Sequence, residues 1–346
     1  MDEGVRSLRE LPSRTRDVLL CVIGEYITTG HAVGSRSALR LVDLGVSAAT
    51  IRATMNELME AGLLAQAHSS AGRTPTDAAF RLWADFLLGE TAATGRVTDR
   101  VKLELGYPEG DLDEYLRRAA DLLSQATGQL GFFVELEFDQ QRLHRVHFVR
   151  VSSERVMALL VSAGGAVRSR VIEERGSDQR VLDQISTRLS AFVAGRTLEE
   201  ARQKLNDEIR RERRKSDALS RAFVTLSAAG LVADEEGEFY VADRTALLGQ
   251  PEFSDIDRVR RLLSALEEKE RMLRLLNKIV RADDLQVVIG DELEDPGVQS
   301  CAVVTARLGS SPPIGGIGVI GPVRMRYDRV IPLVRGVSER VGEALV

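Results

Sequence analysis

Residues 34–76 decide the fold of the N-terminal part of this chain, and they read GSRSALRLVDLGVSAATIRATMNELMEAGLLAQAHSSAGRTPT. The stretch holds two short helical patterns joined by a tight turn. Ser35 and Ser47 are placed to cap these helices, because a serine oxygen accepts hydrogen bonds from the free N–H groups of a first helical turn. Gly45 suits the left-handed backbone of a sharp turn, and Gly62 is a natural end for the second helix. We therefore predict a helix–turn–helix.

The second helix, expected from Ser47 to about Ala61, has two different sides. At 100° per residue, its apolar side consists of Ile51, Met55, Leu58 and Met59. Its opposite side consists of Ala49, Thr50, Ala53 and Asn56, with Arg52 on the flank. The apolar side must pack inward, whereas small or hydrogen-bonding residues permit close approach to base edges in a major groove. An ordinary amphipathic helix of a bundle has the same pattern, so this helix alone leaves both interpretations open.

The residues that follow add a hairpin to the two helices. Segment 63–66 predicts a strand, and segment 68–73, HSSAGR, predicts a flexible tip that carries a cation. Pro75 then ends the unit. A helix–turn–helix followed by a hairpin is a winged helix, in which His68 and Arg73 are placed to reach phosphates or a minor groove.

The same segments resemble those of the bacterial heat-inducible transcription repressor family, HrcA. The matching segments are VGSRS at 33–37, LGVSAATIR at 44–52, GLL at 62–64, HSSAGRTPT at 68–76, QPEFSD at 250–255 and GGIGVIGPVRMRYDRVIPLV at 315–334. The resemblance spans most of the chain, and its ATIR and SAGR-PT segments are specific. Two segments, of two residues each, depart from it. The family usually has Asn and an acid where this chain has Ala53 and Thr54, and Glu-Pro where it has His31-Ala32.

The resemblance implies a repressor of heat-shock chaperone genes that is released on heat stress. It implies a homodimer on double-stranded DNA, because two reading helices related by a two-fold axis require an inverted-repeat operator, here of the CIRCE type. It also implies a chaperonin as modulator of activity. The expected DNA-contacting residues are Ser35, Arg36, Ser47, Ala49, Thr50, Arg52, Asn56, His68, Ser70 and Arg73. Among these, Thr50 and Arg52 form the core of the reading helix.

The overall charge argues against indiscriminate coating of DNA. The 346 residues carry a formal net charge of −5, and the first ninety contain nine arginines, no lysine and eleven acidic residues. Phosphate neutralisation supplies most of the affinity of non-specific binders, so a net-acidic module with a few placed arginines fits a sequence-selective one. The two cysteines, Cys21 and Cys301, form no disulfide framework and suit a reducing compartment.

The rest of the chain predicts an α+β protein of several domains. Helices are expected over 13–29, 76–88, 112–123, 181–193, 254–280 and 327–345, and strands over 132–138, 146–151, 156–162, 167–173, 285–289, 300–307 and 316–320. Short turns between neighbouring strands favour one antiparallel sheet, and Gly164-Gly165 suits a hairpin turn. Trp83 is expected to pack inside its domain. A charged, mainly helical block interrupts the sheet.

These patterns give the following division. We expect a winged-helix DNA-binding domain over 1–88, a linker over 89–96, a GAF-like domain over 97–196 and 254–346, and an inserted dimerising domain over 197–253. The GAF-like assignment and the dimerising role come from the family resemblance, whereas the interruption itself is visible in the composition.

Other patterns have ordinary explanations. Gly316-x-Gly318-x-x-Gly321 matches a dinucleotide fingerprint in form, but Pro312-Pro313 precedes it and too few residues follow, so the glycines are expected to thin a strand. The run 210–215 is interleaved with acids and reads as a solvated helix face. His144 and His147 lack a third metal ligand. We therefore expect no metal, no cofactor and no enzymatic activity.

Two alternatives stay open beside repression. The GAF-like resemblance allows a small-molecule-responsive transcription regulator, and a winged helix can also serve as a protein-binding scaffold. No signal peptide and no apolar run of membrane-spanning length is visible, so we expect a cytoplasmic, nucleoid-associated protein without membrane contact.

Overall fold

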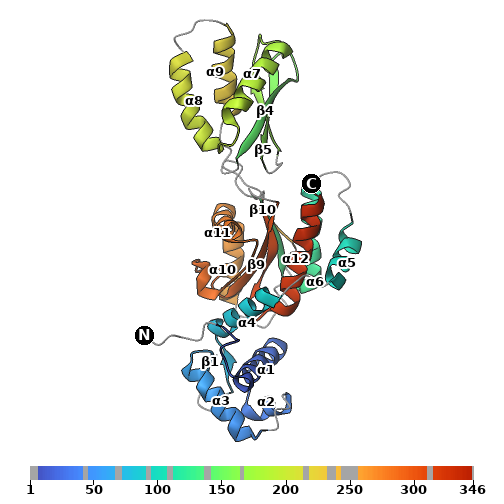
Figure 1. Cartoon of the computed structure of the whole chain (residues 1–346), viewed down its shortest axis with the longest axis vertical. Coiled ribbons are helices and arrows are strands. Elements are labelled where there is room, and N and C mark those ends of the chain that lie inside the picture. The colour runs from blue at the N-terminus through green and yellow to red at the C-terminus, as the bar shows by residue number, and fades with distance from the viewer. Residues whose placement is uncertain are drawn as a thin grey trace.

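The computed structural model describes residues 7–41, 46–66, 72–90, 95–106, 112–135, 142–163, 167–212, 218–231, 239–242, 256–309 and 315–344. Figure 1 shows three units stacked along the long axis of the molecule. We call them the lower unit, from α1 to α4, the central unit, built on the larger sheet, and the upper unit, from β4 to α9.

The lower unit begins with the three helices that the sequence predicts. They are α1 (Ser13–Thr29), α2 (Ser35–Leu41) and α3 (Ala48–Glu60). Gly30 ends α1 in the left-handed region at φ 70°, and its N–H donates to the carbonyl of Tyr26. Gly62, at φ 73°, follows α3 as expected. Gly45 lies outside the described residues.

A short hairpin and a fourth helix complete the lower unit. Strands β1 (Leu64–Ala65) and β2 (Thr74–Pro75) pair antiparallel. Helix α4 (Asp77–Glu90) follows directly, because the hydroxyl of Thr76 accepts from the N–H of Ala79 and so caps its first turn. The strand predicted over 63–66 and the helix predicted over 76–88 are confirmed by β1 and α4, with small shifts at their ends.

The central unit is built on an antiparallel sheet in the order β7-β3-β10-β9-β8 within the described residues. Its strands are β3 (Leu130–Glu135), β7 (Phe239–Val241), β8 (Leu285–Ile289), β9 (Cys301–Leu308) and β10 (Gly315–Pro322). Alternate side chains enter two separate cores. Helices α5 (Gly95–Leu105), α6 (Leu112–Thr127) and α12 (Tyr327–Ala344) pack on one face, and α10 (Ile256–Glu267) and α11 (Lys269–Ala282) on the other.

The glycines of β10 have the structural role that the sequence predicts. A Cβ at Gly316 would lie 2.3 Å from Cγ2 of Val280 on α11, and one at Gly318 would lie 2.1 Å from the carbonyl oxygen of Val304 on β9. Any side chain at these positions would force the helix or the neighbouring strand away. The glycines therefore thin the strand so that α11 can pack close to the sheet.

The strands expected to form one sheet in fact form two. Strands β4 (Leu143–Arg150), β5 (Arg155–Ser162) and β6 (Val167–Glu173) pair only with one another, in the order β4-β5-β6. Each of these strands pairs with the strand next to it in the chain. Strand β3 instead pairs with β10 and with β7, a strand that the sequence analysis did not predict. The turn at Gly164-Gly165 lies outside the described residues.

Helices cover one face of this smaller sheet. They are α7 (Gln179–Val193), α8 (Leu198–Glu212) and α9 (Ala218–Gly230), and with the sheet they enclose a core of their own. The charged segment that looked like a mainly helical block is therefore part of a mixed unit that starts near residue 143. The helix expected over 254–280 is also divided, into α10 and α11, at Glu268.

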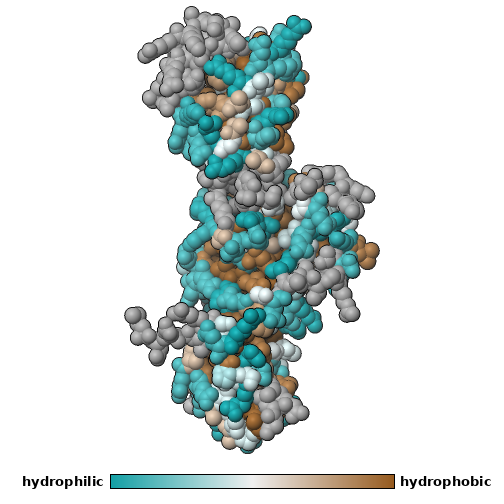
Figure 2. Space-filling model, in the orientation of Figure 1, coloured by the Kyte–Doolittle hydropathy of each residue, from teal (hydrophilic) through white to brown (hydrophobic). Residues whose placement is uncertain are grey.

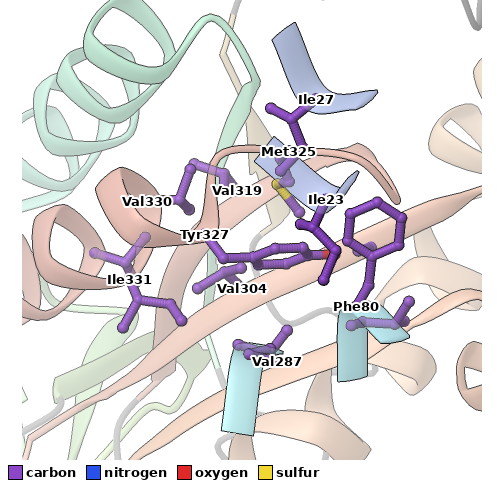
Figure 3. Packing of buried hydrophobic residues seen from close by; sticks show 14 of the residues in the cluster. Ile23, Ile27, Phe80, Val287, Val304, Val319, Met325, Tyr327, Val330 and Ile331 are labelled. Carbon is purple, nitrogen blue, oxygen red and sulfur yellow. The ribbon is translucent and has the colours of Figure 1, made fainter. Parts of the chain in front are cut away.

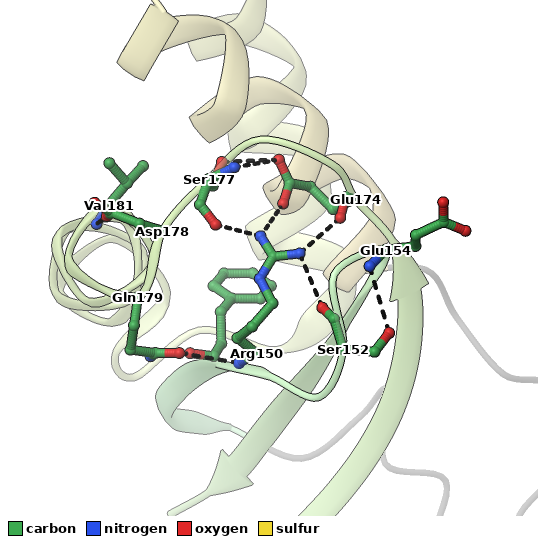
Figure 4. A network of polar contacts seen from close by, with 9 residues as sticks. Arg150, Ser152, Glu154, Glu174, Ser177, Asp178, Gln179 and Val181 are labelled. Carbon is green, nitrogen blue, oxygen red and sulfur yellow. Dashed lines mark hydrogen bonds and ion pairs between the residues drawn. The ribbon is translucent and has the colours of Figure 1, made fainter.

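Arg150 forms hydrogen bonds that join β4 to the segment between β6 and α7 (Figure 4). Its guanidinium donates to the carbonyl of Glu174 at 2.7 Å, to the carboxylate of the same residue at 2.5 Å and to the carbonyl of Ser177. Gln179 accepts from the N–H of Arg150 at 3.0 Å. The end of β4 is thereby tied to the loop that joins β6 to α7.

Among the described residues, no helix is long and apolar enough to cross a membrane. Both cysteines are free; Cys301 lies in the central core, where burial raises the pKa of its thiol to about 12.

Candidate nucleic-acid interface

Helix α3 exposes the side that the sequence analysis singled out. Ala49, Arg52 and Asn56 are exposed, together with Ala53, and Thr50 is half-buried. The opposite side is closed, because Ile51, Met55 and Leu58 are at most 2 % exposed. Thr54, one of the two residues of α3 that depart from the family pattern, is also buried at 1 %. Of these two residues of α3, only Ala53 therefore lies on the side that faces outward.

The start of α3 is held by a local pair of hydroxyls. The Ser47 oxygen accepts from the N–H of Thr50 at 3.2 Å and lies 3.0 Å from the Thr50 hydroxyl. The predicted cap is confirmed. The pair fixes the orientation of Thr50 at the N-terminus of α3, where exposed N–H groups and the helix dipole favour an anion such as a phosphate.

Arg73 and Asn56 connect the hairpin to α3. Nη2 of Arg73 donates to Oδ1 of Asn56 at 3.1 Å, and Arg73 exchanges two backbone hydrogen bonds of 2.8 Å with Val33. Arg73 therefore lies beside α3, directly before β2, where the loop of the hairpin ends. The preceding residue must be glycine, because a Cβ at Gly72 would lie 2.5 Å from the backbone of Val33.

The other four residues predicted to contact DNA belong to α2 and to the segment between β1 and β2. Helix α2 begins at Ser35 itself, which is half-buried, while Arg36 next to it is exposed. His68 and Ser70 fall in segment 67–71, outside the described residues. Of the ten predicted residues, the structure thus brings Ser47, Ala49, Thr50, Arg52, Asn56 and Arg73 together, with Ser35 and Arg36 at the start of the neighbouring helix.

A shared core positions this surface relative to the central unit (Figure 3). Tyr327 of α12 is fully buried against Phe80 and Trp83 of α4, with ring centroids 6.3 and 5.7 Å apart. Ile23 and Ile27 of α1 belong to the same cluster. Trp83 was expected to pack inside its own domain; it is half-buried and packs against the shared core, with its ring on Tyr327 of the central unit. Burial raises the pKa of Tyr327 well above its usual value.

Two arginines add polar contacts across the same junction. Nη1 of Arg324, from the central unit, donates at 2.6 Å to the carbonyl of Ile27 in the last turn of α1. Nη1 of Arg81, from α4, donates to the carbonyl of Val287 on β8. Each satisfies a main-chain oxygen of the other unit. The sequence analysis missed both residues, because nothing in a local pattern says which distant carbonyl an arginine will reach.

The described residues include His, Cys, Asp and Glu side chains, the usual protein ligands of metal ions. Among them, no three His, Cys, Asp or Glu side chains lie close enough together to hold a metal ion. His144 and His147 are exposed on β4.

Comparison with known proteins gives one family. The family model described as "HrcA protein C terminal domain" matches residues 113–331. A heat-inducible transcription repressor HrcA of Nitratidesulfovibrio vulgaris (strain Hildenborough) is 35% identical over 347 residues, covering 97% of this chain and 97% of the relative. That of Syntrophobacter fumaroxidans is 34% identical over 343 residues and covers 98% of each chain.

One solved structure has a similar fold. It is described as "Crystal structure of a hypothetical protein at 2.2 A resolution", is 23% identical in sequence and gives a TM-score of 0.59. The match covers 98% of this chain and 99% of that chain, so the likeness in fold extends over all three units.

Proposed function

This chain belongs to the HrcA family of heat-inducible transcription repressors, and we propose that it represses transcription by inserting α3 into the major groove of an operator. One observation carries the proposal. The outward side of α3 is lined by Ala49, Ala53 and other small or polar residues, next to Arg52 and the Asn56–Arg73 pair. Short side chains let the helix backbone approach the bases, and an arginine can read guanine through two hydrogen bonds.

Further features support a winged-helix assignment for the lower unit. The β1–β2 hairpin follows α3 at once, and Arg73, directly before β2, is oriented by Asn56. Exposed Arg36 lies at the start of α2, the helix that precedes the reading helix. In this arrangement α2 and the hairpin contact the backbone, whereas α3 contacts base edges. His68 and Ser70 are proposed contacts of the hairpin tip.

The decisive variant is Arg52→Ala. We expect it to weaken operator binding by about tenfold or more, because one bidentate arginine contact is worth roughly 1–3 kcal/mol of discrimination. The measurement is a gel-shift titration at fixed salt with an inverted-repeat duplex and a scrambled duplex.

A matched control separates charge from contact. Arg14 is exposed on α1, so Arg14→Ala removes the same charge away from α3 and should leave the affinity within about twofold of wild type. Equal affinity of the Arg52→Ala and wild-type proteins for the operator would refute the reading role. Equal affinity of wild type for both duplexes would favour a protein-binding scaffold instead.

We propose that the upper unit makes the homodimer, through the face of its sheet opposite α7. This face is lined by Val149, Met157, Leu159, Val161, Val167 and Val171. Three of these, Val149, Val167 and Val171, are 43 to 62% exposed on the same face, and an exposed apolar patch marks an interaction site. Figure 2 shows apolar surface along the side of the uppermost unit.

The charges at the two ends of this face favour a second copy of the chain as its partner. Arg145 of β4 is paired with Val161 near one end of β5. Glu173 of β6 is paired with Arg155 at the other end of β5. A two-fold axis through the middle of the face would bring Arg145 of one copy near Glu173 of the other. The contact is then self-complementary, as an isologous dimer requires.

The test of the dimer is the variant Val171→Glu. It should convert the protein to monomers in light scattering, because each copy would bury an unpaired carboxylate in an apolar contact. The control Arg175→Glu changes an exposed residue of the following loop and should leave the dimer intact. A dimeric Val171→Glu protein would refute the proposed face.

The operator and the modulator are proposed from the family alone. We propose a CIRCE-type inverted repeat upstream of chaperone genes, release on heat stress, and a chaperonin that modulates activity in the cytoplasm. Footprinting on such an inverted repeat, with and without added chaperonin, tests both.

A further inference from the structure

A cleft of about 630 Å³ lies between the lower and the central unit. Tyr26, Asp77 and Phe80 contribute to its wall from the lower unit. Arg261, Gln299 and Arg324 contribute from the central unit. This volume is in the range of small-molecule sites, which occur preferentially between domains.

The polar groups of the cleft have few partners within the protein. Among the described residues, no hydrogen bond or ion pair engages the Tyr26 hydroxyl, the Arg261 guanidinium or the Gln299 amide. Arg324 binds the Ile27 carbonyl at the back of the cleft, and partial burial lowers the pKa of its guanidinium. The cleft therefore presents donors that only water or a bound molecule can satisfy.

The charges of the two walls differ. The central wall carries the two guanidinium groups, and the lower wall carries the carboxyl of Asp77. The half-buried side chains of Tyr26 and Val323 add apolar surface to the cleft, whereas Phe80 is only 2% exposed. A bound molecule with one negative group would be directed toward Arg261 and Arg324 and away from Asp77, while its apolar part would cover the ring of Tyr26 and the side chain of Val323.

We propose that this cleft binds a small carboxylate with a compact apolar body. Guanidinium groups match a carboxylate in geometry and charge, and the aromatic and aliphatic surface matches the body. The occupant would touch residues of both units at once. Binding therefore stabilises the present orientation of the lower unit relative to the central unit, because a ligand favours the conformation that it binds most tightly. The binding step does not depend on the proposed DNA contact.

The experiment is calorimetric titration of the full-length chain without DNA. The probe is cyclohexanecarboxylate, which has an apolar ring and one carboxylate. Cyclohexylmethanol keeps the ring without the charge, and acetate keeps the charge without the ring. We expect a Kd of about 1 mM or tighter for the probe, and at least about tenfold weaker binding of the other two.

Variants place the binding in the cleft. Arg261→Gln should weaken binding of the probe by about tenfold, because a charge-assisted contact is lost. Arg274→Gln changes an exposed arginine of α11 outside the cleft and should bind as wild type does. Circular dichroism of both variants should match that of wild type. Absence of heat up to about 10 mM probe, equal binding of all three compounds, or unchanged binding by Arg261→Gln would overturn the proposal.

Discussion

The two junctions of the molecule are built in different ways. Between the lower and the central unit, one hydrophobic core runs without interruption from Val18 and Ile23 of α1 through Phe80 to Tyr327 and Val304. The upper unit instead has its own core, drawn from β4 to β6 and α7 to α9. The orientation of the lower unit is therefore set by packing, whereas the upper unit is stabilised independently of the rest.

The difference matters for how a signal can travel. A change in the central unit moves residues that also form the core of the lower unit, because packed cores transmit strain. A change in the upper unit has no such shared core to act through. The proposed reading helix is thus coupled to the central unit through a rigid junction. The proposed dimer contact belongs to the upper unit, which has a core of its own.

The strongest test of this contrast is Tyr327→Ala. We expect it to destabilise the lower and central units together by about 3–5 kcal/mol, the usual cost of removing a buried large aromatic ring. Trp83, the single tryptophan of the sequence, lies 5.7 Å from the Tyr327 ring and reports on the junction. Urea unfolding followed by tryptophan fluorescence measures the effect.

The matched variant in the upper unit is Phe223→Ala. Phe223 is 1% exposed, and its ring is covered by the guanidinium of Arg188. We expect an early transition in circular dichroism and an unchanged midpoint in tryptophan fluorescence. Coincident shifts of both signals in this variant would show that the upper unit does not unfold independently.

A smaller effect is expected from Arg324→Gln. The variant loses a charge-assisted hydrogen bond to the Ile27 carbonyl, so the fluorescence transition should be destabilised by about 1–3 kcal/mol. Arg329→Gln, at an exposed position of α12, should stay within about 0.5 kcal/mol of wild type. If the two variants unfold alike, the contact with α1 does not hold the junction.

The smallest effect concerns Asp77 and pH. Burial, and then the negative charges of Asp291 and Glu292, raise the pKa of the Asp77 carboxyl. A raised pKa means that the folded chain holds this proton more tightly than the unfolded chain does. Its contribution to stability is therefore present below the ordinary carboxyl pKa of about 4 and is lost as the pH rises through the raised value.

The variant Asp77→Asn should remove this dependence. Wild type should lose less than about 1 kcal/mol relative to the variant between about pH 4 and pH 7, because the Asp77 side chain is exposed and its charge is partly screened by solvent. Urea titrations of both proteins at the two pH values measure the difference. A constant difference between the two proteins would contradict the assignment to Asp77.

Much of the local structure could be predicted from the sequence. The helix at 13–29, the cap at Ser47 and the strand at 285–289 occur where periodicity and turn residues place them. The outward side of α3 was also predicted, because burial alternates with the helical repeat. These features depend on residues that are neighbours in the chain.

The pairing of distant segments could not be predicted in this way. The strands of residues 143–173 were assigned to the wrong sheet, because alternation shows that a strand is half-buried without showing which strand lies beside it. The Asn56–Arg73 pair and the contact of Arg324 with Ile27 also join segments that only the tertiary fold brings together. The role of the ten proposed DNA-contacting residues stays a prediction.

The place where the chain leaves the central sheet has a consequence for the ancestry of the molecule. Strand β3 ends at Glu135 and β7 begins at Phe239, and Val134 is paired directly with Phe239. The exit and re-entry points are therefore adjacent, so a simple hairpin turn could replace everything between them without breaking the sheet. Such a splice point allows one module to be exchanged for another during evolution, and it marks where a designer could graft a foreign assembly domain.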